Sequence, residues 1–134
     1  MDLLIYAALG LSLTWAAYAA YMHIATRAAE GRPAAPLFRL FPALADHAGR
    51  ALVYCYSPQC GPCRPMSREV DTLVAGGARI FKLDVSEQPE LAREIGIRAT
   101  PTLVLVEGRT VSRLVLGAKR AEFMQRLLTG DAAD

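Results

Sequence analysis

The feature that most constrains this chain is a run of twenty uncharged residues, from Leu3 to Met22, close to the amino terminus. A helix of that length rises about 30 Å, which matches the thickness of the hydrocarbon core of a bilayer. Tyr6 near one end, and Tyr18 and Tyr21 at the other, lie where amphipathic rings favour the headgroup level. We therefore predict a single-pass membrane-spanning helix within an anchor segment of residues 1–29.

Two other interpretations of this run remain open. Ala17, Tyr18 and Ala19 form a small-x-small sequence that could be a signal-peptide cleavage site, although Asp2 stands where a signal peptide usually has positive residues. The run could also be a buried helix of a soluble protein, although such a helix normally has a polar face that this run lacks.

Positive charge flanks the run on one side only. Three arginines follow the run: Arg27, Arg32 and Arg39. The residue that precedes it is the acidic Asp2. Because Lys and Arg are enriched in cytoplasmic flanks, this asymmetry predicts that the following domain faces the cytoplasm. In a prokaryotic cell the expected membrane is the inner membrane.

The composition indicates one globular domain beyond the run. The chain has 134 residues, 53% of them hydrophobic, which is enough for one core but too few for two ordinary domains. The 15 Lys and Arg nearly balance the 13 Asp and Glu, and no basic run occurs, which argues against a nucleic-acid partner. Three cysteines are too few for a small scaffold held by several disulfides.

Two prolines and a glycine mark residues 30–36 as a short spacer, so we place the folded domain at residues 37–134. Within it, apolar runs of strand length alternate with segments of helical periodicity. This order predicts an α/β domain with a central mixed sheet flanked by helices, its first two strands parallel and its last two an antiparallel hairpin. The expected strands are 51–56, 79–85, 102–106 and 111–116, and the expected helices lie around 42–47, 66–75, 86–95 and 123–128.

The chemistry concentrates in a Cys-Gly-Pro-Cys sequence between the first strand and the following helix. A cysteine at a helix amino terminus faces unpaired N–H groups and the positive end of the helix dipole, which stabilise the thiolate. Cys60 is therefore the predicted reactive thiol, and Cys63 lies close enough in sequence to form a small disulfide ring. Gly61 and Pro62 lie between the two cysteines. Pro62 suits a first helical turn because it has no N–H to lose.

A zinc site is the alternative interpretation of this pair. It would need two more ligands from Cys55, His23 or His47. Cys55 lies in an apolar strand, His23 belongs to the membrane segment, and His47 precedes the first strand. These positions do not assemble a four-ligand cage, so we predict no metal. Cys55 is expected to be a buried small hydrophobic residue, and neither histidine is assigned a role.

Further motifs accompany the cysteines in a fixed order. They are Cys60–Cys63, Phe-Lys-Leu-Asp-Val at 81–85, Gly-Ile-Arg-Ala-Thr-Pro-Thr-Leu at 96–103, and Leu-Gly-Ala at 116–118. With them, roughly residues 50–129 resemble the thioredoxin family. The resemblance implies a thioredoxin-like fold, protein-disulfide reduction through a mixed disulfide, no cofactor, and a cis peptide bond before Pro101. Its partners would be protein disulfides and an electron donor, either a reductase or a membrane thiol carrier.

Residue by residue, the resemblance makes Cys60 the attacking thiolate and Cys63 the resolving thiol. Thr100 and Pro101 would shape the substrate groove, and Gly117 would let a substrate chain approach. The segment before the first strand is short for the family, so the opening edge strand is expected to be reduced or missing.

Two positions depart from the family pattern, and a third, Lys82, matches it but loses its partner. Gln59 replaces the tryptophan that precedes the first cysteine, within the active-site loop. Tyr54 takes the place of the buried aspartate that helps deprotonate the resolving thiol, so Lys82 has lost the acid that partners it. Proton transfer at Cys63 would then rely on Lys82, Tyr54 or water.

These inferences predict a membrane-tethered thiol-disulfide oxidoreductase that reduces protein disulfides. An alternative is a thioredoxin-fold module that holds a membrane-associated client without redox turnover. Capture of a soft metal by Cys60 and Cys63 is a third reading, which a cis Pro101 would obstruct.

Overall fold

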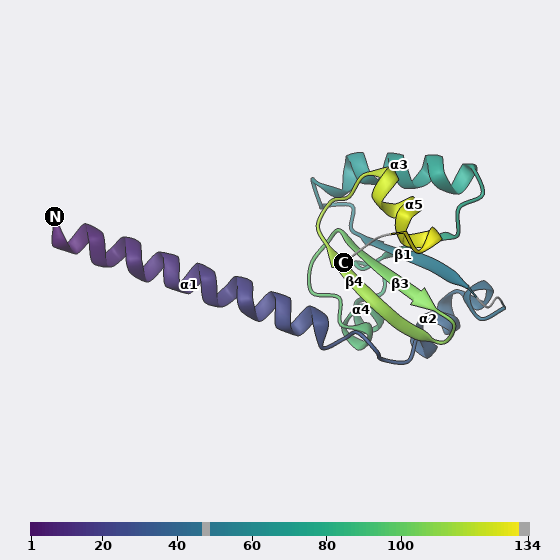
Figure 1. Cartoon of the computed structure of the whole chain (residues 1–134), viewed down its shortest axis with the longest axis horizontal. Coiled ribbons are helices and arrows are strands. Elements are labelled where there is room, and N and C mark those ends of the chain that lie inside the picture. Colours follow the sequence, from purple (N-terminus) through teal and green to yellow (C-terminus); the bar gives the residue numbers. More distant parts are fainter. Residues whose placement is uncertain (47–48, 132–134) are drawn as a thin grey trace.

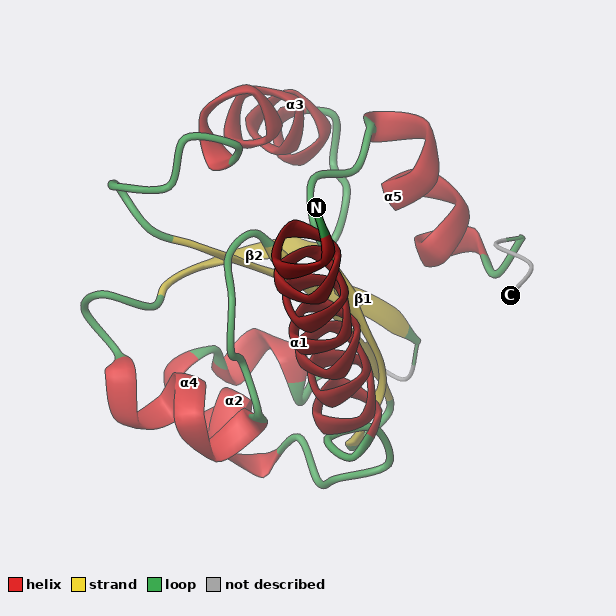
Figure 2. Cartoon of the chain, turned by 90° about the vertical axis from the view of Figure 1, so that its left-hand side faces the viewer, coloured by secondary structure: helices red, strands yellow, loops and turns green. Residues whose placement is uncertain are grey.

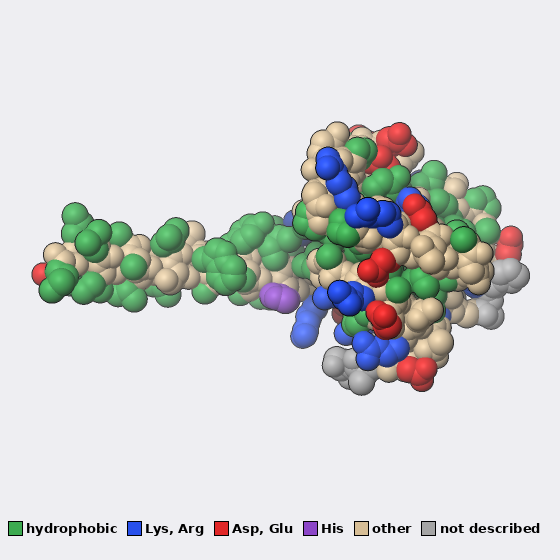
Figure 3. Space-filling model, turned by 90° about the horizontal axis from the view of Figure 1, so that it is seen from above, with side chains coloured by type: hydrophobic (Ala, Val, Ile, Leu, Met, Phe, Trp, Pro, Cys, Tyr) green, Lys and Arg blue, Asp and Glu red, His purple; other side chains and the backbone are tan. Residues whose placement is uncertain are grey.

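A computed structural model describes residues 1–46 and 49–131 and shows a long helix that projects from a layered domain (Figure 1). The helix, α1 (Asp2–Arg27), is long and apolar enough to cross a membrane, a test that a signal sequence would also pass. None of its most apolar 18-residue window is buried by the described residues, and apolar side chains cover its projecting part (Figure 3). The interpretation of the run as a buried core helix is therefore wrong.

The domain is built on a mixed four-stranded sheet with the order β2-β1-β3-β4. The strands are β1 (Arg50–Tyr56), β2 (Ile80–Asp84), β3 (Thr102–Glu107) and β4 (Thr110–Leu116). β1 and β2 are parallel, and β3 pairs antiparallel with both β1 and β4, as the order of elements predicts. In the described part of the chain β2 has no strand on its outer side, which agrees with the expected loss of the opening edge strand.

Helices cover both faces of the sheet, which forms the middle layer in Figure 2. One side carries α3 (Cys63–Ala75) and α5 (Ala121–Thr129), and the other carries α2 (Ala35–Leu40), η1 (Pro42–Leu44) and α4 (Pro89–Ile95). β1 is central and its residues 51–55 are all buried, so alternate side chains contribute to the two apolar clusters, one on each face. This is the thioredoxin-like α/β fold.

The segment before β1 is more structured than its composition suggests. α2 begins at Ala35 with Pro36 in its first turn, where a proline loses no hydrogen bond, and its Leu37 is fully buried. The helix expected around 42–47 is a single 3-10 turn that ends at Leu44, and His47 lies outside the described residues.

The residues predicted as a spacer pair with the outer edge of β4. The N–H of Gly31 donates to the carbonyl oxygen of Val111 (2.7 Å). The N–H of Val111 donates to the carbonyl oxygen of Arg32 (2.9 Å). The N–H of Ala34 donates to the carbonyl of Arg109 (2.8 Å), and Ala34 is fully buried. Composition does not reveal this pairing, because it depends on an edge strand far along the chain. The result is that α1 joins the domain through ordered backbone.

A glycine at the end of α4 makes room for this segment. Gly96 has φ +87°, and a Cβ there would lie 2.6 Å from the Cβ of Ala29, whereas Gly77 has φ +92° and open space around it. We expect Gly77→Ala to cost about 1–2 kcal/mol for the left-handed conformation alone. Gly96→Ala should cost more, because Ala29 must also move. Urea unfolding of both variants measures the difference, and equal losses would contradict the contact.

Candidate active site

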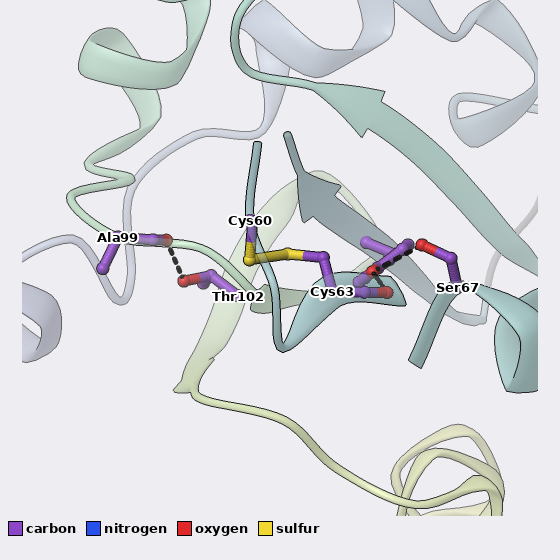
Figure 4. The surroundings of a disulfide bond; sticks show 6 residues. Cys60, Cys63, Ser67, Ala99 and Thr102 are labelled. Atoms are coloured by element: carbon purple, nitrogen blue, oxygen red, sulfur yellow. Dashed lines mark hydrogen bonds between the residues drawn. A yellow bond between two sulfur atoms is a disulfide. The ribbon is translucent and has the colours of Figure 1, made fainter. Parts of the chain in front are cut away.

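The two cysteines of the Cys-Gly-Pro-Cys sequence lie between the end of β1 and the start of α3. They form a disulfide with a Cα to Cα distance of 5.3 Å (Figure 4). Cys63, the first residue of α3, is 2% exposed, whereas Cys60 lies in the preceding loop and is partly exposed. A substrate sulfur can therefore reach Cys60 and not Cys63, which is the arrangement that separates an attacking thiol from a resolving one.

The surroundings of Cys60 favour its thiolate. The start of α3 directs its unpaired N–H groups toward the loop, and a negative charge at this position is stabilised by the helix dipole. A shallow cavity of about 430 Å³ lies beside the pair. Its lining includes the exposed Pro58 and two arginines of α3. The lining residues are Tyr56, Ser57, Pro58, Cys60, Cys63, Arg64, Ser67 and Arg68.

A second loop completes the site from the other side of the disulfide. The Thr100-Pro101 peptide bond is cis, as the family resemblance implies. The hydroxyl of Thr102 donates to the carbonyl oxygen of Ala99 (2.7 Å), and Figure 4 shows both residues beside Cys60. The N–H of Gly117 donates to the carbonyl oxygen of Pro101 (2.9 Å), so the end of β4 joins the same edge. The fold thus brings the predicted groove residues together with the cysteines.

Tyr54 occupies the buried position beneath Cys63. Its side chain is fully buried, and its hydroxyl donates to the carbonyl oxygen of Cys63 (3.0 Å) and shares a hydrogen bond with the hydroxyl of Ser67 (2.9 Å). Burial raises the pKa of Tyr54 above its ordinary value. The phenol is therefore neutral at physiological pH, and in this position it holds the first turn of α3 by hydrogen bonds.

Lys82 has an acidic partner after all. Its Nζ lies 2.9 Å from Oδ1 of Asp71 and 5.2 Å from the centre of the Tyr56 ring. The expectation that Lys82 lacks an acidic partner is therefore wrong. The aspartate of the family pattern would lie on the neighbouring strand, whereas here Asp71 on α3 provides the carboxylate. A sequence signal for it exists: Cys63, Ser67 and Asp71 recur every four residues on one face of α3.

The remaining loop positions are exposed. Gln59, Gly61 and Pro62 all face solvent beside the disulfide, so the amide of Gln59 stands at the rim of the site. In the described part of the chain no group of three or more His, Cys, Asp or Glu side chains could hold a metal ion. His23 is exposed on α1, away from the cysteines in sequence and on a different element.

The third cysteine is separated from the pair by the sheet. Cys55 is fully buried in the cluster under α2 and α4, whereas the neighbouring Tyr54 belongs to the cluster under α3 and α5. Desolvation raises the pKa of the Cys55 thiol to about 12. Since the thiolate is the reactive form, Cys55 is inert in the folded protein.

We expect reduced folded protein to release two equivalents of chromophore rapidly from a chromogenic disulfide reagent at pH 7–8, because Cys60 attacks the reagent and Cys63 then resolves the mixed disulfide. A third equivalent should appear only after unfolding. Cys55→Ala should leave the rapid phase unchanged. A third rapid equivalent in the folded wild type would contradict the burial of Cys55.

Comparison with known proteins gives the same assignment. The Thioredoxin family model matches residues 40–129, more than half of the chain. Thioredoxin 1 of Nostoc is 36% identical over 70 residues, which are 50% of this chain and 65% of that protein. The thioredoxin of Bacillus subtilis is 32% identical over 83 residues, 60% of this chain and 80% of that protein. A chloroplastic thioredoxin of Arabidopsis thaliana is 32% identical, and the chain spans only 42% of its length.

Solved structures agree in fold. A thioredoxin of Halobacterium salinarum superposes with a TM-score of 0.61 at 32% identity, covering 68% of this chain and 80% of that one. A thioredoxin of Nicotiana alata gives a TM-score of 0.57 at 29% identity, with coverage of 68% and 81%. The cysteine pair, the cis proline beside it and the family match lead to one conclusion: this chain belongs to the thioredoxin family.

Proposed function

We propose that this protein is a membrane-tethered thiol-disulfide oxidoreductase that reduces disulfides in protein substrates. The observation that carries the proposal is the pairing of a partly exposed Cys60 with a buried Cys63 beside the cis peptide bond of Pro101. A module that only holds a client would have no use for two thiols at disulfide distance.

The proposed reaction has two exchange steps. The thiolate of Cys60 attacks one sulfur of the substrate disulfide, which forms a mixed disulfide and releases the other substrate sulfur as a thiolate that takes up a proton. The thiol of Cys63 loses its proton and attacks Sγ of Cys60, which releases the second substrate thiol. The substrate gains two electrons and two protons, and the protein ends with the Cys60–Cys63 disulfide.

A dithiol electron donor must then reduce this disulfide by the same exchange in reverse. For a domain in the cytoplasm, the side that the arginines after α1 favour, a soluble reductase system would supply the electrons. For a domain on the other side, a membrane carrier of thiols would be needed.

The tether is proposed to be α1. In support, the end of this helix lies against the domain: Thr26, in its last turn, is 6% exposed, and Ala29, two residues beyond the helix, is 1% exposed. A retained anchor also fits Asp2 ahead of the run, where a signal peptide usually has positive residues.

The test is the reduction potential of the Cys60/Cys63 couple in the full chain, held in detergent and equilibrated with dithiothreitol or glutathione buffers. A value near the thioredoxin potential of about −270 mV would support a reductase. A value higher by tens of millivolts would indicate an isomerase or oxidant, since about 30 mV is a tenfold change in the equilibrium constant. Failure to form the disulfide would favour the client-holding module.

A further inference from the structure

The direction in which α1 leaves the domain is fixed relative to the disulfide. Residues 30–34 run antiparallel to β4, from Glu30, whose Oε1 accepts the N–H of Leu114 (3.2 Å), to Ala34 beside Arg109. α1 must therefore project beyond the carboxyl end of β4. That end continues into Gly117, which is hydrogen-bonded to Pro101 at the active site.

A side-chain contact ties the same end of the sheet to the helix. The guanidinium of Arg98 donates to the hydroxyl of Tyr21 (3.1 Å) and lies 5.6 Å from the centre of its ring. Arg98 and Pro101 are three residues apart, so their Cα atoms are at most about 11 Å from each other. Figure 2, which looks nearly along α1, shows the helix in front of the domain at this end.

The length of α1 leaves little room between this end and a bilayer. Its uncharged run ends at Met22, so Tyr21 lies at the boundary of the hydrocarbon core. The five residues from His23 to Arg27 add about 7 Å of helix, which is the depth of one headgroup layer. The loop that carries Arg98 therefore lies at headgroup level. The backbone hydrogen bonds between residues 31–34 and the edge of β4 hold the domain close to the end of α1, so that it cannot turn away from the bilayer.

The rim around the disulfide suits close approach by another chain. Pro58, Gln59, Gly61 and Pro62 on one side, and Ala99 and Ala118 on the other, are exposed, uncharged and mostly small. A backbone can lie against this part of the rim without displacing a charged side chain from water, because the charged residues of the cavity, Arg64 and Arg68, lie on the α3 side.

From this geometry we infer that the active site faces the membrane surface, and that its substrate is a disulfide at the headgroup-level end of a membrane-spanning protein that lies beside α1. The inference rests on the proposed tether and on the proposed disulfide chemistry. It adds an orientation and a substrate class that neither of them requires.

The orientation is tested with two proteins that each have one accessible cysteine, one at each end of β4. In a Cys60→Ser/Cys63→Ser background, Ala118→Cys marks the active-site end and Thr110→Cys the opposite end, about 20 Å away along the strand. Both positions are exposed, and Cys55 is buried. Each protein is labelled with a fluorophore and reconstituted in phosphatidylcholine vesicles that contain a headgroup-spin-labelled lipid.

We expect quenching at position 118 to exceed that at position 110 severalfold. Insertion of twelve Gly and Ser residues between Arg27 and Ala28 should remove most of the difference, because the domain is then free to tumble. Equal or reversed quenching in protein that floats with the vesicles would overturn the orientation while leaving the tether intact. Protein that does not float overturns the tether, and the orientation with it.

The substrate class is tested with the Cys63→Ser protein in the same vesicles. The probes are single-span helical peptides with a thiopyridyl disulfide, either directly after the hydrophobic segment or after a 20-residue helical extension that raises it by about 30 Å. Attack by Cys60 forms the mixed disulfide and releases thiopyridone, which absorbs light. The headgroup-level probe should react severalfold faster, and a soluble peptide with the same group checks that Cys60 is active. Faster reaction of the raised probe would overturn the inference.

Discussion

Replacement of Cys60 by serine should lower the rate of disulfide reduction by at least about 10³-fold, the scale of loss when a nucleophile is removed. Cys63 cannot take over, because its side chain is only 2% exposed. Turnover of an insulin disulfide by the full chain in detergent, with dithiothreitol as donor, measures the effect.

Replacement of Cys63 by serine should give a different failure. Cys60 still attacks once, but the mixed disulfide has no internal thiol to resolve it, so the covalent complex accumulates and can be seen on a non-reducing gel. Cys55→Ala is the matched control and should keep full turnover, because Cys55 lies on the other face of the sheet. Turnover that survives Cys60→Ser and is lost only with Cys63→Ser would reverse the two roles.

Tyr54 is expected to be among the most sensitive positions for stability. Removing a fully buried aromatic side chain leaves a cavity, so Tyr54→Ala should lower the free energy of unfolding by about 3–5 kcal/mol. Tyr54→Phe keeps the ring and loses only the hydrogen bonds to Cys63 and Ser67, so it should cost about 1–2 kcal/mol. Urea unfolding of the oxidised proteins measures both values. A cost for Tyr54→Phe close to that of Tyr54→Ala would show that the hydroxyl, and not ring packing, dominates.

The same residue gives a pH dependence with a defined sign. The pKa of Tyr54 is raised in the folded state, mainly by desolvation, so the unfolded chain releases its phenolic proton first as the pH rises. The stabilising contribution is complete below about pH 10, the ordinary tyrosine pKa, and is lost as the pH rises through the folded-state value. Tyr54→Phe should therefore flatten the decline of stability above pH 10. An identical decline in both proteins would exclude Tyr54 as its cause.

The sequence allows prediction of those parts that depend on local pattern. The parallel pairing of β1 with β2, the closing hairpin and a helix directly after the cysteine pair follow from the order of elements, short-range periodicity and turn residues. The cis bond before Pro101 could be expected only from the family resemblance, because cis is the minority state in general.

Other parts depend on contacts between distant residues. The ion pair of Lys82 with Asp71 joins a strand to a helix face, and the backbone pairing of residues 31–34 with β4 joins positions about eighty residues apart. In the second case, glycine and proline correctly signal the absence of a regular helix. They do not distinguish a free spacer from an extended segment that fits a sheet edge.

That pairing decides where a soluble fragment of this protein can begin. A fragment that starts at residue 37 would remove the backbone groups that cover Val111 and Arg109, and would leave the space of the buried Ala34 empty. An uncovered edge strand is a template for another strand, so such a fragment is expected to dimerise or aggregate through β4. A fragment that starts at Ala28 keeps the cover without the apolar helix and should remain monomeric in analytical ultracentrifugation.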